Sequence, residues 1–505
     1  MLRLLGLSED WLYTFILAVV TFLMTFIYIR DKRLRSFLPP GPTAWPLLGN
    51  LPQLIGKDLH IALTKMGKQY GPLVWLKMAG ENVLVVNNMD AAVASFVRQG
   101  NVFSGRPKKR KTVEVLLGNG RDIVMADRCP ELKIHRKIVH SFLASQTKSG
   151  KNRLEVIMAR EYESFSNKLE IISDNGEAFD PKLHVARVVA NVLCQCILNR
   201  RFDDVDESFH EQLSVIQDII DSIESFNIVD VIPFLEHFPI PSWKRFRKSL
   251  LKRDVWIKQI LEEHRATLDP DVNRDLVDIM LNLQQQATDT GDEEQLHLLN
   301  DTNIGHIVHE LFGGGIETTT ITVLWFIIYL IRNPQWQDKI YEEIKENIGT
   351  DGIPSPFDRV KFPILEATIK ETLRMACVLP VGFPHRTMAD TRVSEHFIPK
   401  DTMVIMNIWA IHHDEKAWTD PNTFNPGRFL KESVSERYSY LPFGIGNRVC
   451  LGSNIAKMEA FMFCACLVSK YRFMAPNKES LPDTTGLSGL TMRPKPFQIR
   501  LEKRT

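Results

Sequence analysis

The stretch that decides the fold is a glycine-rich loop with one cysteine, followed at once by a helical pattern: Phe443-Gly444-Ile445-Gly446-Asn447-Arg448-Val449-Cys450-Leu451-Gly452. Glycines let a backbone approach a ligand closely and turn its amides toward a charge. The start of the following helix adds partial positive charge, so both features favour a thiolate at Cys450. Arg448 stays charged and suits a carboxylate partner. A thiolate, such an arginine and a flat glycine surface together describe a haem site in which Cys450 is the ligand of the iron. A buried free cysteine beside a turn is the alternative.

The same loop fits the pattern Phe-x-x-Gly-x-Arg-x-Cys-x-Gly at every fixed position. It therefore resembles the signature of the cytochrome P-450 monooxygenases. The resemblance implies a mainly α cytochrome P-450 fold with a small β region near the N-terminus. It also implies that Phe443, Gly444, Arg448 and Gly452 help to bind haem b (iron protoporphyrin IX), with Cys450 as the metal ligand.

Composition narrows the class of protein. The chain has 505 residues, of which 44% are hydrophobic, and a formal net charge of +1, so no nucleic-acid partner is indicated. Its seven cysteines form no zinc-type Cys-x-x-Cys pairs. We expect buried structural thiols at every cysteine except Cys450, which suits a reducing compartment.

Near the N-terminus, residues 11–29 form an apolar run without charge. As a helix this run spans about 28 Å, close to the ~30 Å hydrocarbon thickness of a bilayer. Basic residues follow it, so the positive-inside rule places the remainder of the chain in the cytosol. We expect a single-pass anchor at residues 1–30 in the endoplasmic reticulum membrane. A cleaved signal peptide fits badly, because the run is long and no small-residue cleavage site follows it.

A basic and proline-rich hinge at residues 31–44 follows, and residues 45–505 form the expected haem-binding catalytic domain. Within that domain, 73–78 and 83–87 are predicted to form a hairpin. Residues 284–294 are polar and predict an exposed loop.

The pattern from about Asn303 to Arg332 predicts one long helix that contains three consecutive glycines, 313–315. Each glycine costs up to ~1 kcal/mol relative to alanine in a helix interior, so the run needs a reason. The resemblance supplies one, since the equivalent helix crosses the haem in the family and small residues leave room for oxygen and substrate. Glu317 and Thr318 follow and match the acid–alcohol pair that delivers protons during oxygen activation. A glycine-loosened core helix is the alternative.

A second helical stretch, 132–137, is similar to the family segment that contacts a haem propionate. Arg136 is in place, but Leu132 stands where the family has tryptophan, which puts one propionate contact in doubt. Lys133, Arg136 and Lys137 are also candidates for a basic face that docks an acidic redox partner. Solvated charges on an ordinary amphipathic helix are the alternative.

Two further motifs fit the family. Glu371 and Arg374 share one helix face at i and i+3, and the resemblance places Arg428 against them as a buried network. His385 follows a strand-like stretch, 379–383, and by resemblance donates to a haem propionate. An ordinary polar histidine is the alternative.

Several blocks of the sequence are most similar to the steroid 17α-hydroxylase/17,20-lyases of vertebrates. These blocks are Phe103–Pro107, Phe312–Thr320, Leu365–Arg374, Asn407–Trp418 and Tyr440–Cys450. The resemblance implies a membrane-bound monooxygenase that hydroxylates a hydrophobic, steroid-like substrate with O2 and electrons from an NADPH-cytochrome reductase, with cytochrome b5 as a second candidate partner. The positions expected to face substrate are apolar or small: Ile316, Leu379, Val381, Gly382, Phe383 and Leu487. A broad-specificity oxidase of xenobiotics and aromatic hydrocarbons is the alternative. A reductase-independent haem-thiolate isomerase and a haem sensor fit less well, because neither needs the acid–alcohol pair.

Overall fold

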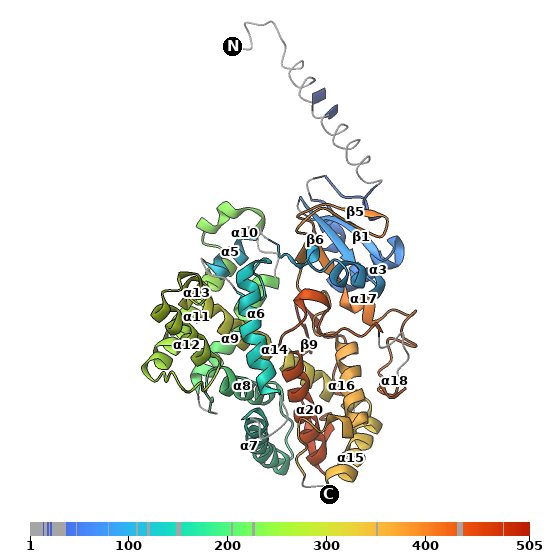
Figure 1. Cartoon of the computed structure of the whole chain (residues 1–505). Helices are drawn as coiled ribbons and strands as arrows, with labels where there is room; N and C mark the ends of the chain where they lie inside the picture. Colours follow the sequence, from blue (N-terminus) through green and yellow to red (C-terminus); the bar gives the residue numbers. More distant parts are fainter. Residues whose placement is uncertain are drawn as a thin grey trace.

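A computed structural model gives the fold of the chain (Figure 1). It describes residues 14, 18–19, 21–22, 37–46, 48–78, 80–107, 110–118, 122–147, 153–203, 206–224, 228–349, 352–431, 438–477 and 479–504. The predicted anchor at 1–30 lies almost wholly outside these residues, and the five residues described there are helical and exposed.

The molecule is mainly helical, as expected. The longer helices are α3 Leu59–Tyr70, α5 Lys111–Leu117, α6 Pro130–Gln146, α7 Arg153–Asn175, α8 Lys182–Ile197, α9 Glu207–Glu224, α11 Pro241–Ala266, α12 Leu276–Thr290, α13 Glu293–Leu298, α14 Asp301–Arg332, α15 Pro334–Ile348, α16 Pro363–Ala376 and α20 Ser453–Lys470. The short helices are α2 Leu51–Leu54, α4 Met89–Ala92, η2 Val93–Val97, η3 Val102–Ser104, α10 Ile228–Val231, η4 Pro233–His237, η5 Arg359–Lys361, α17 Ile408–His412, α18 Gly427–Leu430 and η6 Gly446–Arg448.

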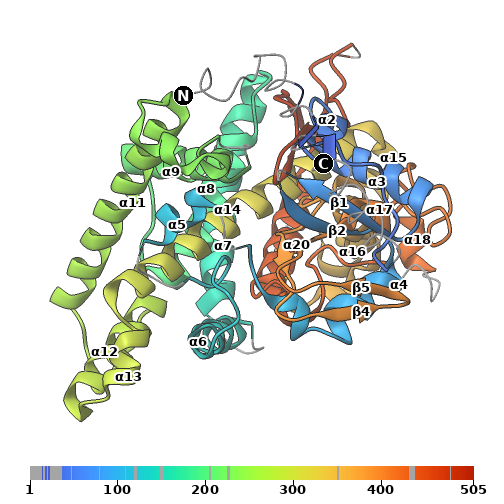
Figure 2. The same cartoon turned by 90° about the horizontal axis from the view of Figure 1, so that it is seen from above.

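Helix α14 is the central element, and it confirms the predicted long helix. It begins at a capped end, where the side chain of Asn300 accepts the Asn303 N–H. It packs against α8, α11, α16 and α20 and runs through the main hydrophobic cluster (Figures 1 and 2). Among the described residues it is the one helix long and apolar enough to span a membrane, but most of it is buried inside the protein, as in a core helix.

The β region includes a four-stranded sheet in the order β1-β2-β6-β3, with β1 Leu73–Met78, β2 Glu81–Val86, β6 Met403–Met406 and β3 His385–Arg386. Strands β1 and β2 form the predicted antiparallel hairpin, in which Leu73 pairs with Val86. Alternate residues of both strands enter two hydrophobic clusters, one on each face of the sheet. Strand β6 pairs parallel to β2 and antiparallel to β3, which brings His385 to the sheet.

Three two-stranded pairs complete the strands. They are β7 Tyr471–Met474 with β10 Arg500–Lys503, β4 Thr391–Val393 with β5 His396–Ile398, and β8 Leu487–Ser488 with β9 Met492–Arg493. All seven cysteines are free. Burial raises the pKa of Cys194 and Cys464, which accords with structural thiols.

Two local expectations are wrong. The polar stretch 284–294 is mostly helical, because α12 continues to Thr290 and Gly291 then ends it in the left-handed conformation at φ +70°. Its exposed polar side chains occupy the solvent face of a helix. The stretch 379–383 forms turns, with Gly382 at φ +57°, and the strand begins later, at His385.

The described part of the proline-rich hinge lies against the sheet. Trp75 N donates to the Pro40 carbonyl at 2.9 Å, and a Cβ on Gly41 would lie 2.0 Å from the Trp75 oxygen. Glycine is therefore needed at position 41 by this close approach. Residues 40 and 41 of the predicted hinge are therefore held against strand β1.

The predicted buried network is confirmed. Arg374 donates to both carboxylate oxygens of Glu371, at 2.8 and 2.9 Å, and Arg428 donates to the same carboxylate at 3.1 Å. Both guanidinium groups also donate to backbone carbonyls of the 412–423 region. A buried charge network with its donors satisfied holds α16 against the loop that precedes the cysteine stretch.

Candidate active site

The cysteine loop is a tight turn that ends at α20. Cys450 N donates to the Phe443 carbonyl at 3.1 Å, and Gly444 and Gly446 adopt φ values of +74° and +80°. A Cβ on Gly446 would lie 2.0 Å from the Phe96 oxygen. Glycine is therefore required at position 446 both by its positive φ and by this close contact. Gly452 forms the N-cap of α20, two residues after the cysteine.

Cys450 is exposed, although many protein atoms lie around its sulfur. Burial raises the pKa of this thiol, while the amides of Gly452 and Ser453 and the charges of Arg136 and Lys457 act in the opposite direction. The sequence correctly predicts the direction of the amide effect. Burial outweighs it, so a stable thiolate needs a bound cation such as a metal.

Several positively charged side chains lie near the cysteine loop. Arg448 donates to three carbonyls, those of Ser104 at 2.9 Å, Ile123 at 3.2 Å and Ala126 at 2.6 Å. Arg136 donates to the Val449 carbonyl at 3.0 Å. Burial and the charge of Arg136 lower the pKa of Arg448 to about 10. Among the described residues, neither arginine forms a salt bridge.

Arg106 is a member of this cluster that sequence reasoning missed. It is buried and donates to the carbonyls of Val124 at 2.7 Å and Pro384 at 2.8 Å. Burial and the charge of Arg448 lower its pKa to about 9. The sequence did contain a sign that Arg106 differs from the solvated basic residues. It stands between Gly105 and Pro107, before the basic run at 108–111 begins.

His385 belongs to the same cluster. Its Nδ1 lies 2.7 Å from the Phe103 carbonyl, and burial together with Arg106 lowers its pKa well below the usual range, so the ring is neutral. Nδ1 of the neutral ring donates to this carbonyl, so Nε2 carries a lone pair and can donate to a carboxylate only when the ring gains a proton. Leu132 is buried in α6, one turn before Arg136, and offers no donor, as expected.

The three glycines of α14 have different surroundings. A Cβ on Gly315 would lie 2.4 Å from Leu193 of α8, and one on Gly313 would be in ordinary contact with Ile216 of α9. Gly314 alone is exposed, with no atom within 4 Å of the added Cβ. Helix packing therefore explains why position 315 is glycine. Of the three glycines, only Gly314 leaves free space beside the helix.

The acid–alcohol pair lies next to this opening. Thr318 Oγ1 donates to the Gly314 carbonyl at 2.7 Å, and Glu317 accepts from the Thr491 hydroxyl at 3.3 Å. Thr491 belongs to the β8–β9 hairpin, so the C-terminal segment contacts the acid–alcohol pair. Ile316 instead packs in the main core, because it lies 200° around the helix from Thr318, so its assignment to the substrate face is wrong.

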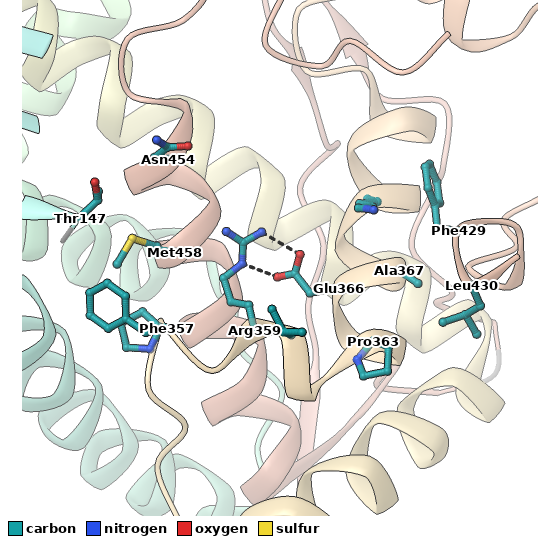
Figure 3. A pocket seen from close by; sticks show the side chains of 13 residues that line it. Thr147, Phe357, Arg359, Pro363, Glu366, Ala367, Phe429, Leu430, Asn454 and Met458 are labelled. Atoms are coloured by element: carbon teal, nitrogen blue, oxygen red, sulfur yellow. Dashed lines mark hydrogen bonds and ion pairs between the residues drawn. The ribbon is translucent and has the colours of Figure 1, made fainter. Parts of the chain in front are cut away.

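A pocket of about 560 Å³ opens on the surface close to the cysteine loop (Figure 3). Asn454 and Met458 of α20 line one side, so the pocket reaches the first turn of α20, four residues after Cys450 in the sequence. Arg359 crosses it and donates to both oxygens of Glu366, at 2.6 and 2.7 Å. Val360 on its rim is 92% exposed.

These residues fit a haem. The set comprises a thiol at a helix start, three arginines without ion pairs in the described chain, a neutral histidine and an open glycine face. An iron porphyrin has a metal for the sulfur, two carboxylates for the cations and a flat ring for the glycines. The fold and the site together define a haem-thiolate enzyme.

Comparison with known proteins agrees. Residues 39–501 match the family model "Cytochrome P450", and the chain belongs to this family. It is 34% identical to a steroid 17-alpha-hydroxylase/17,20 lyase of Ictalurus punctatus, with 98% of this chain and 97% of that protein covered. A protein of the same name from Gallus gallus is 36% identical over 92% of each chain. A solved zebrafish cytochrome P450 with progesterone is 32% identical, with a TM-score of 0.78, over 88% of this chain and 99% of that one.

Proposed function

We propose that the chain is a steroid-hydroxylating monooxygenase in which Cys450 binds the iron of haem b. The observation that carries this proposal is the exposed Cys450 at the start of α20, together with three arginines that form no ion pair among the described residues and the open face of Gly314. Arg106, Arg136 and Arg448 would hold the propionates, and His385 would donate to one of them from Nε2 once its ring is protonated. Phe443, Gly444 and Gly452 form the loop around the sulfur. A bound haem supplies a reducible iron that activates O2 for insertion of one oxygen atom.

Glu317 and Thr318 would supply the protons that oxygen activation consumes. The Thr318 hydroxyl lies where Gly314 leaves space, and it can exchange its bond to the Gly314 carbonyl for one to a water or to oxygen. Glu317 is half-buried and can reload that water with a proton as a general acid. The pair favours a monooxygenase over a haem-thiolate isomerase or a haem sensor.

The substrate proposed is a steroid. Support comes from the near full-length similarity to steroid 17-alpha-hydroxylases and from the related structure solved with progesterone. The positions Leu379, Val381, Gly382 and Phe383 supply an apolar lining, which favours burial of hydrocarbon at roughly 25 cal/mol per Å². Optical titration of the haem-loaded protein tests this. A progestogen should convert the iron from low to high spin at micromolar concentration, whereas a response to planar aromatics alone would support the xenobiotic alternative.

The electron donor proposed is an NADPH-cytochrome reductase, with cytochrome b5 as a second donor. Lys133 and Lys137 are exposed on α6. The pocket crossed by Arg359 is lined by Asn454, four residues after Cys450 in the sequence. An acidic partner that contacts α6 and this pocket would have a short path to the sulfur. Charge reversal at Lys133 and Lys137 should slow reduction by the reductase at low salt without changing the haem spectrum. An unchanged reduction rate would exclude this face.

For the membrane, we propose that residues 1–30 anchor the chain in the endoplasmic reticulum and that residues 31–44 orient a cytosolic catalytic domain, residues 45–505. The apolar run and the basic residues after it support this topology. Deletion of residues 1–30 should release protein from microsomes while the haem remains bound. Loss of haem from the truncated protein would contradict a purely anchoring role.

A further inference from the structure

Glu310 is a half-buried acid of α14 that the proposed chemistry does not use. It lies eight residues before Thr318 and one turn before Gly314, so it shares their side of the helix. Its Oε2 accepts the Ile123 N–H at 2.8 Å. The Val124 N–H lies 3.2 Å from Oε1 and 3.3 Å from Oε2. One carboxyl group thus binds two consecutive backbone amides of a loop distant in sequence.

A second carboxyl group completes this contact. Asp122 is 1% exposed and its Oδ1 accepts the N–H groups of Met125 at 2.9 Å and Ala126 at 2.5 Å. Burial raises the pKa of Glu310 well above its usual range, and the charge of Asp122 adds to this. Between them, Glu310 and Asp122 accept the four consecutive N–H groups of residues 123–126.

The carbonyls of the same loop face the haem cluster. Arg448 donates to Ile123 and Ala126, and Arg106 donates to Val124. The 122–126 segment is therefore bound through its N–H groups by the two acids and through its C=O groups by the two arginines. Any movement of this segment away from α14 also moves the acceptors that orient both arginines.

We propose that Glu310 and Asp122 together latch the 122–126 segment to α14, which makes Glu310 a positioning residue for Arg106 and Arg448. The role of the arginines rests on the proposed haem site, but the latch itself does not.

Two variants of Glu310 separate this role from simple filling of space. Glu310→Gln keeps the shape, since its amide oxygen can still accept the loop N–H groups. Glu310→Ala removes both interactions. A matched control exists in Glu343 of α15, which is buried and accepts the N–H groups of Ile364 at 2.7 Å and Leu365 at 2.9 Å. Glu343→Ala removes the same kind of contact elsewhere in the core.

The first measurement is amide hydrogen exchange of the full-length holoprotein. Exchange in the 122–126 segment should become at least tenfold faster in Glu310→Ala, should stay within about twofold of wild type in Glu310→Gln, and should not change in Glu343→Ala, where tenfold corresponds to about 1.4 kcal/mol. Unchanged exchange in Glu310→Ala overturns the latch. Equal loss of protection in Glu310→Gln would overturn the claim that hydrogen bonds to the side-chain oxygen hold the segment, since the glutamine keeps such an acceptor.

The second measurement is haem transfer from each variant to apomyoglobin. Glu310→Ala should lose haem several-fold faster than wild type, whereas Glu310→Gln and Glu343→Ala should not. Faster exchange of the loop with unchanged haem loss would uphold the latch and overturn the positioning of Arg106 and Arg448. Absence of haem from wild-type protein would overturn the proposed function, and the exchange result would still stand alone.

Discussion

The N–H of Cys450 donates to the carbonyl of Phe443 at 3.1 Å and closes the loop that presents the sulfur. The backbone can make this closure because Gly444 and Gly446 adopt positive φ. The bond is formed by main-chain atoms, so a change of the Cys450 side chain leaves the loop intact and tests the sulfur alone.

Cys450→Ser should abolish the long-wavelength band of the reduced carbon monoxide complex, because a serine oxygen does not supply thiolate ligation. Circular dichroism should show unchanged helix content. Retention of the band in the variant would show that another residue binds the iron.

Arg106→Leu should lower the haem content of the purified protein. Hydrogen bonds to a charged group are worth ~1.5–3 kcal/mol, so haem should dissociate about tenfold faster or more. The ratio of haem to protein absorbance and the rate of haem transfer measure this. Arg106→Lys keeps the charge and should show a smaller loss. Equal haem retention in all three proteins would exclude Arg106 from the site.

Thr318→Ala should uncouple the reaction. NADPH consumption should continue while peroxide rises and the yield of product per NADPH falls about tenfold or more, as expected for loss of a proton donor. Thr320→Val is a suitable control, because the Thr320 hydroxyl is buried without a hydrogen-bond partner among the described residues. An unchanged yield in Thr318→Ala would refute the proton-relay role.

Glu371→Ala should destabilise the protein by ~3–5 kcal/mol, because Arg374 and Arg428 would remain buried without their carboxylate. Chemical denaturation of the holoprotein measures the loss. Glu415, whose bond to Lys68 is exposed, is the surface control, and Glu415→Ala should cost less than about 1 kcal/mol. Similar losses in both variants would argue against a buried network.

His264 should make stability depend on pH. Burial lowers its pKa, but the hydrogen bond from Nε2 to Asp275 at 2.9 Å, the charges of Asp275 and Asp278 and the bond to the Ile260 carbonyl together raise the pKa above 6.5. The charged ring therefore stabilises the fold fully below pH 6.5, and this stabilisation is lost as pH rises through the folded-state pKa. The difference in unfolding midpoint between wild type and His264→Gln should shrink from mildly acidic to alkaline pH. If the difference in unfolding midpoint grew with pH instead, the charged form of His264 would not be the stabilising one.

Several features of the fold and of the site could be predicted from short stretches of the sequence. The cysteine loop, the long helix over the glycines and the pairing of Glu371 with Arg374 all follow from neighbours within a few residues. Backbone conformation and helix spacing act at that range, so the sequence alone shows them. The β1–β2 hairpin was predictable for the same reason.

Only the tertiary structure decided which of these residues meet and what surrounds them. Arg106 joins Arg448 because a β bridge brings Gly105 beside Arg386, far along the chain. Gly314 opens to the interior while Gly315 packs on Leu193, a distinction set by which helix lies on each face of α14. Burial makes the net shift at Cys450 opposite to that of its local amides. Burial and long-range contacts depend on the whole fold, and a linear pattern does not contain them.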